Sequence, residues 1–312
     1  MVKELVIASG KGGTGKTSIG AALATLAPAK VLADCDVDAA NLHLVVGSRL
    51  KEAHDFFAGF SPAVDEKACL HCGRCTNLCR FGAIEDGMIS RPLACEGCGV
   101  CAFNCPAHAI SMVDKKAGQW LVSETRHGLL VHAELGLAVD NSGKLVSEVR
   151  RQAKSRAEKR RLPLIITDGP PGVGCPAIAA LTGASLVLAV TEPSLSGIHD
   201  LERLFFLCHH FGVPVAVCIN KADISEENTR AIVALSNRER ASVVGEIPYD
   251  DAFLEAALTG CTVLETGSAA LTGEIKRLWL AVAGLLGVEP GGSSSCGLER
   301  LIDRFGGRRG MP

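Results

Sequence analysis

Eight of the fourteen cysteines lie in two groups whose spacing is typical of iron–sulfur ligands. Residues 69–79 read Cys-x-x-Cys-x-x-Cys-x-x-x-Cys, and residues 95–105 repeat this spacing. Three cysteines of such a group hold one [4Fe–4S] cluster, and the fourth ligates the other cluster. The spacing therefore predicts two [4Fe–4S] clusters, the first bound by Cys69, Cys72, Cys75 and Cys105, and the second by Cys95, Cys98, Cys101 and Cys79.

The two cysteine groups belong to an internal repeat. Gly73 aligns with Gly99, and Ala83-Ile84 aligns with Ala109-Ile110. Zinc sites instead use two Cys-x-x-Cys pairs separated by about a dozen residues or more, so the pattern favours iron. The repeat resembles a two-cluster bacterial ferredoxin.

One residue departs from the ferredoxin pattern. Arg80 follows the fourth cysteine of the first group, where ferredoxins carry a proline such as Pro106. A cation stabilises the reduced form of a nearby cluster, so we expect a higher potential for the cluster that Cys79 ligates. Among the other cysteines, Cys208 and Cys218 are expected to pack in the core. Packing is also favoured for Cys35, and Cys175 is interpreted as a small residue that opens a helix, although its role stays open.

A second stretch with clear chemistry is the glycine-rich segment 10–17, which fits the phosphate-binding pattern G-x-x-x-x-G-K-[ST]. Glycines allow the backbone amides to surround a phosphate group. Lys16 is expected to contact the β- and γ-phosphates and Thr17 to ligate Mg²⁺. The nucleotide would be bound by Gly12, Gly13, Thr14, Gly15, Lys16, Thr17 and Ser18.

The elements that must position this loop form a series of apolar strands and helices. Hydrophobic residues make up 47% of the 312 residues, which is enough for a large core, and the net charge of −2 gives no general attraction to nucleic acid. Unbroken apolar runs at 4–8, 30–36, 162–172, 184–194 and 213–223 predict strands buried on both faces. We predict an α/β fold with a doubly wound, mostly parallel sheet, whose ligands bind at the carboxyl ends of the strands.

The segment "KGGTGKT" resembles the deviant phosphate loop of the MinD/ParA/Mrp ATPases, a group that includes the nitrogenase iron protein. The resemblance implies that Lys11 reaches the nucleotide of a partner subunit. It also implies that Asp36 orients the attacking water and that Asp34 and Asp168, with Thr17, surround Mg²⁺. The catalytic residues would be Lys11, Lys16 and Asp36.

Two later segments extend the resemblance. "NKAD" at 220–223 matches the strand end that contacts the base, so Asn220 is the expected adenine contact. "IPYDD" at 247–251 matches a loop that packs on adenine, which makes Pro248 and Asp250 further candidates.

The strand pattern is interrupted by the cysteine groups, which indicates an insertion. We expect the ATPase domain to comprise residues 1–60 and 115–286, with a small α+β ferredoxin-like domain at 61–114. Residues 119–135 read as a hairpin, and 287–312 as a flexible linker with a short tail. The combination resembles the MinD-like ATPases of the orange-protein complex.

These features leave three functional classes open. The first is an ATPase in which nucleotide-controlled dimerisation gates electron transfer through two clusters. The second is an Mrp-like factor that assembles or inserts a metal cluster, and the third is a spatial-positioning ATPase. The expected partners are a second copy or a paralogous ATPase and a redox or metal-cluster client. We expect a cytoplasmic protein without a membrane span and without a nucleic-acid partner, because the basic run at 150–161 reads as a solvated helix face.

Overall fold

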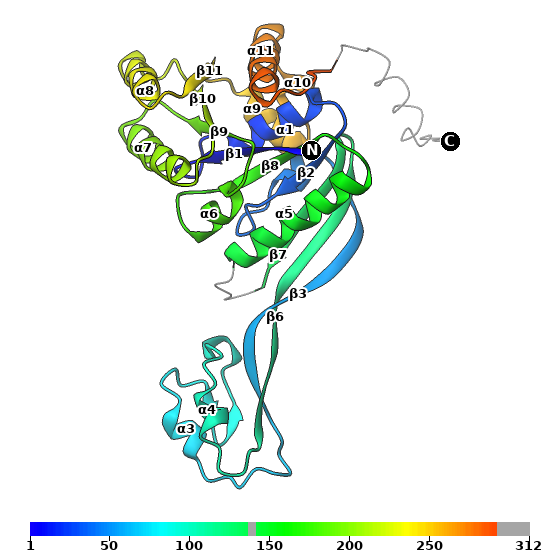
Figure 1. The fold of residues 1–312 in the computed structure, drawn as a ribbon, viewed down its shortest axis with the longest axis vertical. Helices are drawn as coiled ribbons and strands as arrows, with labels where there is room; N and C mark the ends of the chain where they lie inside the picture. Colours follow the sequence, from blue (N-terminus) through cyan, green and yellow to red (C-terminus); the bar gives the residue numbers. More distant parts are fainter. Residues whose placement is uncertain (137–141, 292–312) are drawn as a thin grey trace, which may run out of the picture.

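The computed structural model describes residues 1–136 and 142–291. Its main sheet has nine strands in the order β11-β10-β9-β1-β8-β2-β7-β6-β3 (Figure 1). The strands from β11 to β7 pair in parallel, whereas β6 pairs antiparallel with both β7 and β3. The bounds in this spatial order are β11 Ser242–Ile247, β10 Val215–Asn220, β9 Leu186–Thr191, β1 Lys3–Ser9, β8 Leu164–Pro171, β2 Lys30–Asp34, β7 Gly128–Leu135, β6 Ile110–Thr125 and β3 Ser48–Val64. The predicted mostly parallel α/β sheet is confirmed.

Helices cover both faces of the sheet, because successive strand residues alternate between two apolar cores. In β1, Val6 and Ala8 point into one core, and Leu5 and Ile7 into the other. The first core is closed by α5 Ser142–Lys159, α6 Cys175–Leu181, α7 Leu195–His210 and α8 Glu226–Arg238. The second is closed by α1 Lys16–Leu26, α2 Leu42–Val45, α10 Val263–Thr266 and α11 Ala269–Leu286, with α9 Ala252–Thr259 beside them.

A long two-stranded ribbon leaves one edge of this sheet. It is formed by β3 and β6, which pair from Ser48 with Thr125 to Val64 with Ile110. At its base, Trp120 stacks on His54 with ring centroids 3.9 Å apart, and the Arg156 guanidinium of α5 lies 5.2 Å from the Trp120 ring. The predicted hairpin is confirmed, since β6 turns into β7 at residues 126–127. The expected domain boundary at 60/61 falls inside β3.

The cysteine module, residues 65–109, lies at the far end of the ribbon (Figure 1). It contains α3 Arg74–Leu78, the 3₁₀ helix η1 Pro92–Ala94 and α4 Val100–Phe103, together with a two-stranded sheet of β4 Ile84–Glu85 and β5 Met88–Ile89. Its buried hydrophobic cluster consists of Ile84 and Cys101, together with Ile110 at the start of β6. A core this small contributes little to folding, so the module is expected to need its ligands for stability.

Candidate functional site

The glycine-rich loop lies at the carboxyl end of β1 and leads into α1. Gly15 caps α1 in the left-handed conformation, with φ 93°, and a Cβ at this position would lie 2.5 Å from the Asn220 amide nitrogen. Only glycine fits such a position without strain. Lys16 begins α1 and is 5% exposed. The predicted phosphate-binding residues 12–18 therefore form the glycine turn and the first residues of α1.

Two buried carboxylates lie at the ends of neighbouring strands beside the loop. Asp34 of β2 pairs in register with Asp168 of β8. The Thr17 hydroxyl donates a hydrogen bond of 2.6 Å to the Asp168 carboxylate, and the backbone amides of Asp36 and Leu42 donate to Asp34, both over 3.1 Å. The structure therefore brings together the three residues that were expected to surround Mg²⁺.

Burial makes this pair of carboxylates hard to ionise. It raises the pKa of Asp168 to about 6, against the opposing charge of Lys16. Burial, and then the neighbouring Asp168, raise the pKa of Asp34 well above its ordinary value. Burial also raises the pKa of Asp36, which is half-buried and also faces the charge of Lys16. Lys16 only partly offsets the burial of these acids, and a bound cation would stabilise their charged forms further.

Several buried polar atoms at the site have no partner. Among the described residues, five buried side-chain polar atoms lack a hydrogen bond, and three of them belong to Thr14, Asp168 and Asn220. Buried polar groups are nearly always paired, so a cluster of unpaired ones points to a ligand. The residues therefore fit a phosphate and a hydrated cation.

The candidate base-contacting residues also come together. The Asn220 side-chain amide donates to the backbone oxygen of Thr14 over 2.9 Å, which ties the end of β10 to the phosphate loop. The Asp223 carboxylate accepts a 2.7 Å hydrogen bond from the Tyr249 backbone amide, so it holds the loop that contains Pro248 and Asp250. Whether these residues contact adenine stays a prediction.

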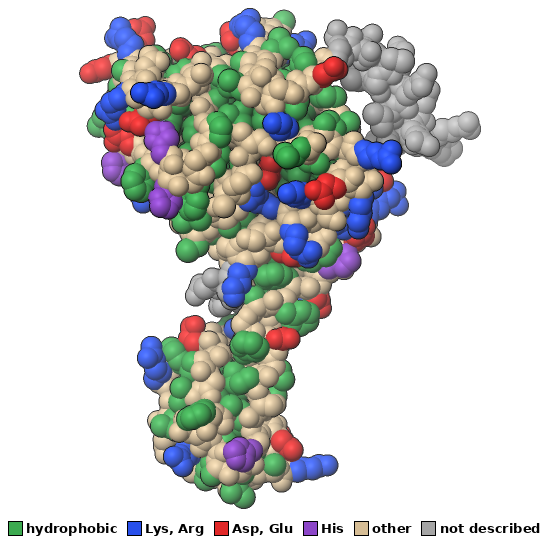
Figure 2. Space-filling view, in the orientation of Figure 1, with side chains coloured by type: hydrophobic (Ala, Val, Ile, Leu, Met, Phe, Trp, Pro, Cys, Tyr) green, Lys and Arg blue, Asp and Glu red, His purple; other side chains and the backbone are tan. Residues whose placement is uncertain are grey.

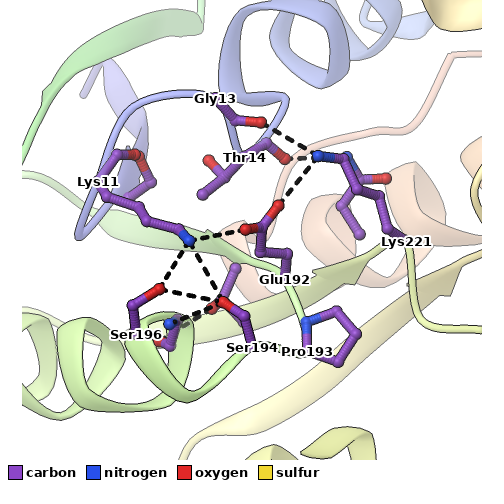
Figure 3. Close-up of polar contacts among 12 residues, drawn as sticks. Lys11, Gly13, Thr14, Glu192, Pro193, Ser194, Ser196 and Lys221 are labelled. Carbon is purple, nitrogen blue, oxygen red and sulfur yellow. Dashed lines mark hydrogen bonds and ion pairs between the residues drawn. The ribbon is translucent and has the colours of Figure 1, made fainter. Parts of the chain in front are cut away.

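Lys11 makes a set of contacts that the sequence did not predict (Figure 3). Its ammonium lies 2.7 Å from one carboxylate oxygen of Glu192, and the Lys221 ammonium lies 2.9 Å from the other. Burial of Glu192 alone would raise its pKa, but the hydrogen bonds from the two lysines hold the pKa below its ordinary value. Glu192 directly follows β9, so its place at the carboxyl end of a predicted strand was the available signal.

In the cysteine module, the eight cysteines line two separate cavities. One cavity is lined by Cys69, Cys72, Cys75 and Cys105 among other residues. The other is lined in the same way by Cys79, Cys95, Cys98 and Cys101. Among the described residues, no group of three or more His, Cys, Asp or Glu side chains is placed to share one metal ion. In each cavity, the fourth cysteine of one group lies with the first three cysteines of the other group.

The sequence repeat is also a repeat of backbone conformation. Gly73 and Gly99 cap α3 and α4 with φ 69° and 76°. The amide of Cys79 donates to the oxygen of Thr76, and that of Cys105 donates to Ala102, both over 3.3 Å. The two halves therefore present their cysteines in the same way. Figure 2 shows apolar side chains on the surface of the module. Leu70, Leu93 and Phe103 are exposed large apolar residues of this module.

The remaining cysteines lie apart from these cavities. Cys35, Cys208 and Cys218 are buried in the two sheet cores, as the packing interpretation predicts. Cys175 is exposed at the start of α6, and Cys261 is partly buried. Cys296 and the predicted tail lie outside the described residues.

Comparison with known families identifies the domain that carries the phosphate loop. A model of the CobQ/CobB/MinD/ParA nucleotide binding domain matches residues 5–263. The chain belongs to this family. The uncharacterized protein MJ0578 of Methanocaldococcus jannaschii is 34% identical over 232 residues, which cover 73% of this chain and 81% of the relative. The same organism contains a second relative, MJ0579, which is 28% identical over 229 residues, 71% of this chain and 81% of that relative. The expected MinD/ParA-type ATPase is thereby confirmed.

Solved structures show the same fold. The cell division ATPase MinD of Pyrococcus furiosus superposes with a TM-score of 0.55 at 21% identity, covering 91% of this chain and all of that one. MinD of Pyrococcus horikoshii, solved with Mg-ADP, gives a TM-score of 0.52 at 20% identity, covering 92% of this chain and 99% of that one. A shorter match links 70 residues, 22% of this chain, to 86% of the pyruvate synthase subunit PorD of Methanothermobacter marburgensis, with 34% identity.

Within the described part of the chain, no helix combines the length and the apolar character that a membrane crossing requires.

Proposed function

We propose that this ATPase uses ATP-controlled pairing of two subunits to gate electron transfer through two [4Fe–4S] clusters to a partner protein. The observation that carries the proposal is the sorting of eight cysteines into two cavities, each lined by three cysteines of one group and the fourth of the other. A ribbon joins this module to β7 of the nucleotide-binding sheet, so one chain would link a nucleotide switch to a redox module.

The nucleotide half of the proposal rests on the phosphate loop and the two strand-end carboxylates. The amides of the loop and Lys16 would bind the phosphates of ATP. Thr17, Asp34 and Asp168 would hold Mg²⁺, which neutralises phosphate charge. Asp36, which is half-buried and follows Asp34 by two residues, would orient the attacking water. The Mg-ADP bound by the related Pyrococcus horikoshii MinD supports this assignment.

The redox half rests on the donor set. Thiolates are the ligands that iron–sulfur clusters use, and such clusters supply one-electron transfer. Each cavity has one exposed cysteine, Cys72 in the first and Cys98 in the second, so a ligand of each cluster would lie at the surface. The exposed Leu70, Leu93 and Phe103 would form an apolar surface on which a client protein could dock.

The connection between the halves is the ribbon. Its two strands are 17 and 16 residues long, and a strand advances about 3.3 Å per residue, so the module lies far from the sheet. The ATP site would therefore act on the clusters through the arrangement of two paired subunits and not through direct contact. Lys11 would bridge to the partner's nucleotide in that pair.

The test is anaerobic purification of the full chain, with iron and sulfide counting and electron paramagnetic resonance. We expect about eight irons per chain and reduced-cluster signals that change when ATP is added. Molecular mass should double with ATP in wild type. Lys11→Ala should keep ATP binding and lose this pairing. A colourless anaerobic protein, or clusters indifferent to ATP, would refute the proposal.

Cluster assembly is the second candidate. The exposed cysteines in each group favour it, because ligands at the surface are accessible to an acceptor. Incubation with an apo-ferredoxin separates the two functions, since an assembly factor loses its iron to the acceptor and an electron carrier keeps it. The MinD neighbours give some support to a spatial-positioning role, but that role leaves the cysteine module without a use.

A further inference from the structure

The ammonium group of Lys11 is fully engaged within its own subunit. It lies 2.7 Å from Glu192, 2.8 Å from the Ser196 hydroxyl and 3.2 Å from the Ser194 hydroxyl (Figure 3). A lysine has three N–H donors, and here three acceptors surround them. Lys11 therefore has no donor left for a phosphate of a second subunit unless it gives up one of these contacts.

Glu192 is the charged member of this set, and it is shared between two lysines. Its second oxygen accepts from Lys221, whose ammonium also lies 3.4 Å from the backbone oxygen of Gly13 in the phosphate loop. If Lys11 left, the Glu192 carboxylate would still be paired with Lys221. Removing one partner from a half-buried ion pair usually leaves a costly unpaired charge, and this arrangement avoids that cost.

The contacts lie where a second subunit can reach them. The side chains of Lys11 and Glu192 are 30% and 19% exposed. Leu195, between the two serines, is 79% exposed and opens helix α7. A partner covering this face would bury the leucine and approach the lysine together.

We propose that Glu192 is a latch that competes with the nucleotide of a partner subunit for Lys11. The inference rests on the pairing proposed above and adds a residue that sets its nucleotide dependence. Lys11 exchanges one carboxylate for a phosphate only when the phosphate offers more negative charge. ATP carries one more phosphate than ADP and therefore offers more negative charge. Glu192 thereby suppresses pairing in the ADP and nucleotide-free states.

The experiment measures the dimer dissociation constant of the anaerobic full-length protein by sedimentation, with Mg-ATP, with Mg-ADP and without nucleotide. Glu192→Gln keeps the shape of the side chain and removes its charge. We expect its ATP dimer to be tighter by about tenfold, a change of roughly 1.4 kcal/mol, and an ADP dimer to become detectable. Ser196→Ala, which removes one neutral acceptor, should act in the same direction by a smaller factor.

Two controls isolate the latch from a general effect of charge or folding. Glu202 lies on α7, the helix that carries Ser196, and pairs with Arg238 instead of Lys11, so the dissociation constants of Glu202→Gln should match wild type. In a Lys11→Ala background, which is expected not to pair, Glu192→Gln should not restore pairing, because the latch acts only through Lys11. Weaker or unchanged pairing of Glu192→Gln, or an equal gain in the Lys11→Ala background, would overturn the latch.

The outcome also separates this inference from the proposed function. If wild type pairs with ATP and Glu192→Gln behaves identically, the latch is wrong and the proposed pairing stands. If neither protein pairs under any condition, both are wrong. If only Glu192→Gln pairs, the latch is supported.

Discussion

Replacing Asp168 by asparagine should make the magnesium-free protein more stable while it abolishes ATP hydrolysis. Asp168 is buried beside Asp34, and burial raises its pKa to about 6 from an ordinary value of 3.8. At roughly 1.4 kcal/mol per pH unit, keeping this carboxylate ionised in the folded protein costs about 3 kcal/mol. Asparagine has nearly the same shape and carries no such cost.

The sign of the pH dependence follows from the direction of the shift. The folded protein holds the proton of Asp168 more tightly than the unfolded chain does, so the stability contribution is complete below about pH 4. It is lost as the pH rises through about 6. The advantage of Asp168→Asn over wild type should therefore be about 3 kcal/mol at pH 8 and about half of that at pH 5.

The assay is urea unfolding in buffer without nucleotide or magnesium, followed by tryptophan fluorescence. The chain has two tryptophans, Trp120 and Trp279, and both report on the sheet and its helices and not on the cysteine module. Asp38→Asn, on the exposed part of the same loop region, is the matched control and should show no such pH-dependent gain. Added Mg²⁺ should stabilise wild type and leave Asp168→Asn unchanged.

Two results would contradict this prediction: Asp168→Asn is no more stable than wild type at pH 8, or its advantage is the same at both pH values. Either result would mean that ionisation of the buried carboxylate does not destabilise the folded protein. A loss of stability with intact hydrolysis would also remove Asp168 from the proposed magnesium site.

Three further predictions concern the module and the base of the ribbon. Arg80→Pro should lower the potential of the proposed cluster at Cys79 by tens of millivolts, on the order expected for a screened surface charge, and an unchanged potential in an anaerobic redox titration contradicts this. As the pH is lowered, the free energy of unfolding of His132→Gln should fall by about 3 kcal/mol less than that of wild type. Burial lowers the pKa of His132 to about 4, so wild type loses this stability as the pH falls from about 6.5 through 4. If the unfolding free energies of wild type and His132→Gln change equally over that pH range, this prediction is wrong. Gly97→Ala would place a methyl group 2.3 Å from the Phe60 backbone oxygen and should lower the iron content below that of wild type. Gly73→Ala has a similar φ but open space around it, so equal iron loss in both variants would refute the steric argument.

The sequence predicted the parts of the fold whose contacts join residues that are close together in the chain. The run from β1 through the glycine turn to α1 matches expectation because its hydrogen bonds and apolar contacts are set by adjacent residues. The repeated turns of the cysteine module were predictable for the same reason. Each half closes through hydrogen bonds over three or four residues, such as Cys79 to Thr76.

The ribbon was not predicted, because its strands lack the usual signal. Most residues of β3 are exposed, so no apolar alternation marks it. Its partner β6 begins 46 residues after β3 ends, and the pairing holds both strands together. The sequence alone therefore placed a domain boundary in the middle of β3.

By itself, the sequence determined the nucleotide-binding family and predicted the cysteine chemistry, since the spacing of glycines, lysines and cysteines is local and specific. Only the tertiary structure decided how those groups are partnered. Lys11 and Glu192 are 181 positions apart, and Asn220 and Thr14 are 206 positions apart. No local pattern encodes such pairs, because they arise from the order in which parallel strands bring their carboxyl ends to one edge of the sheet.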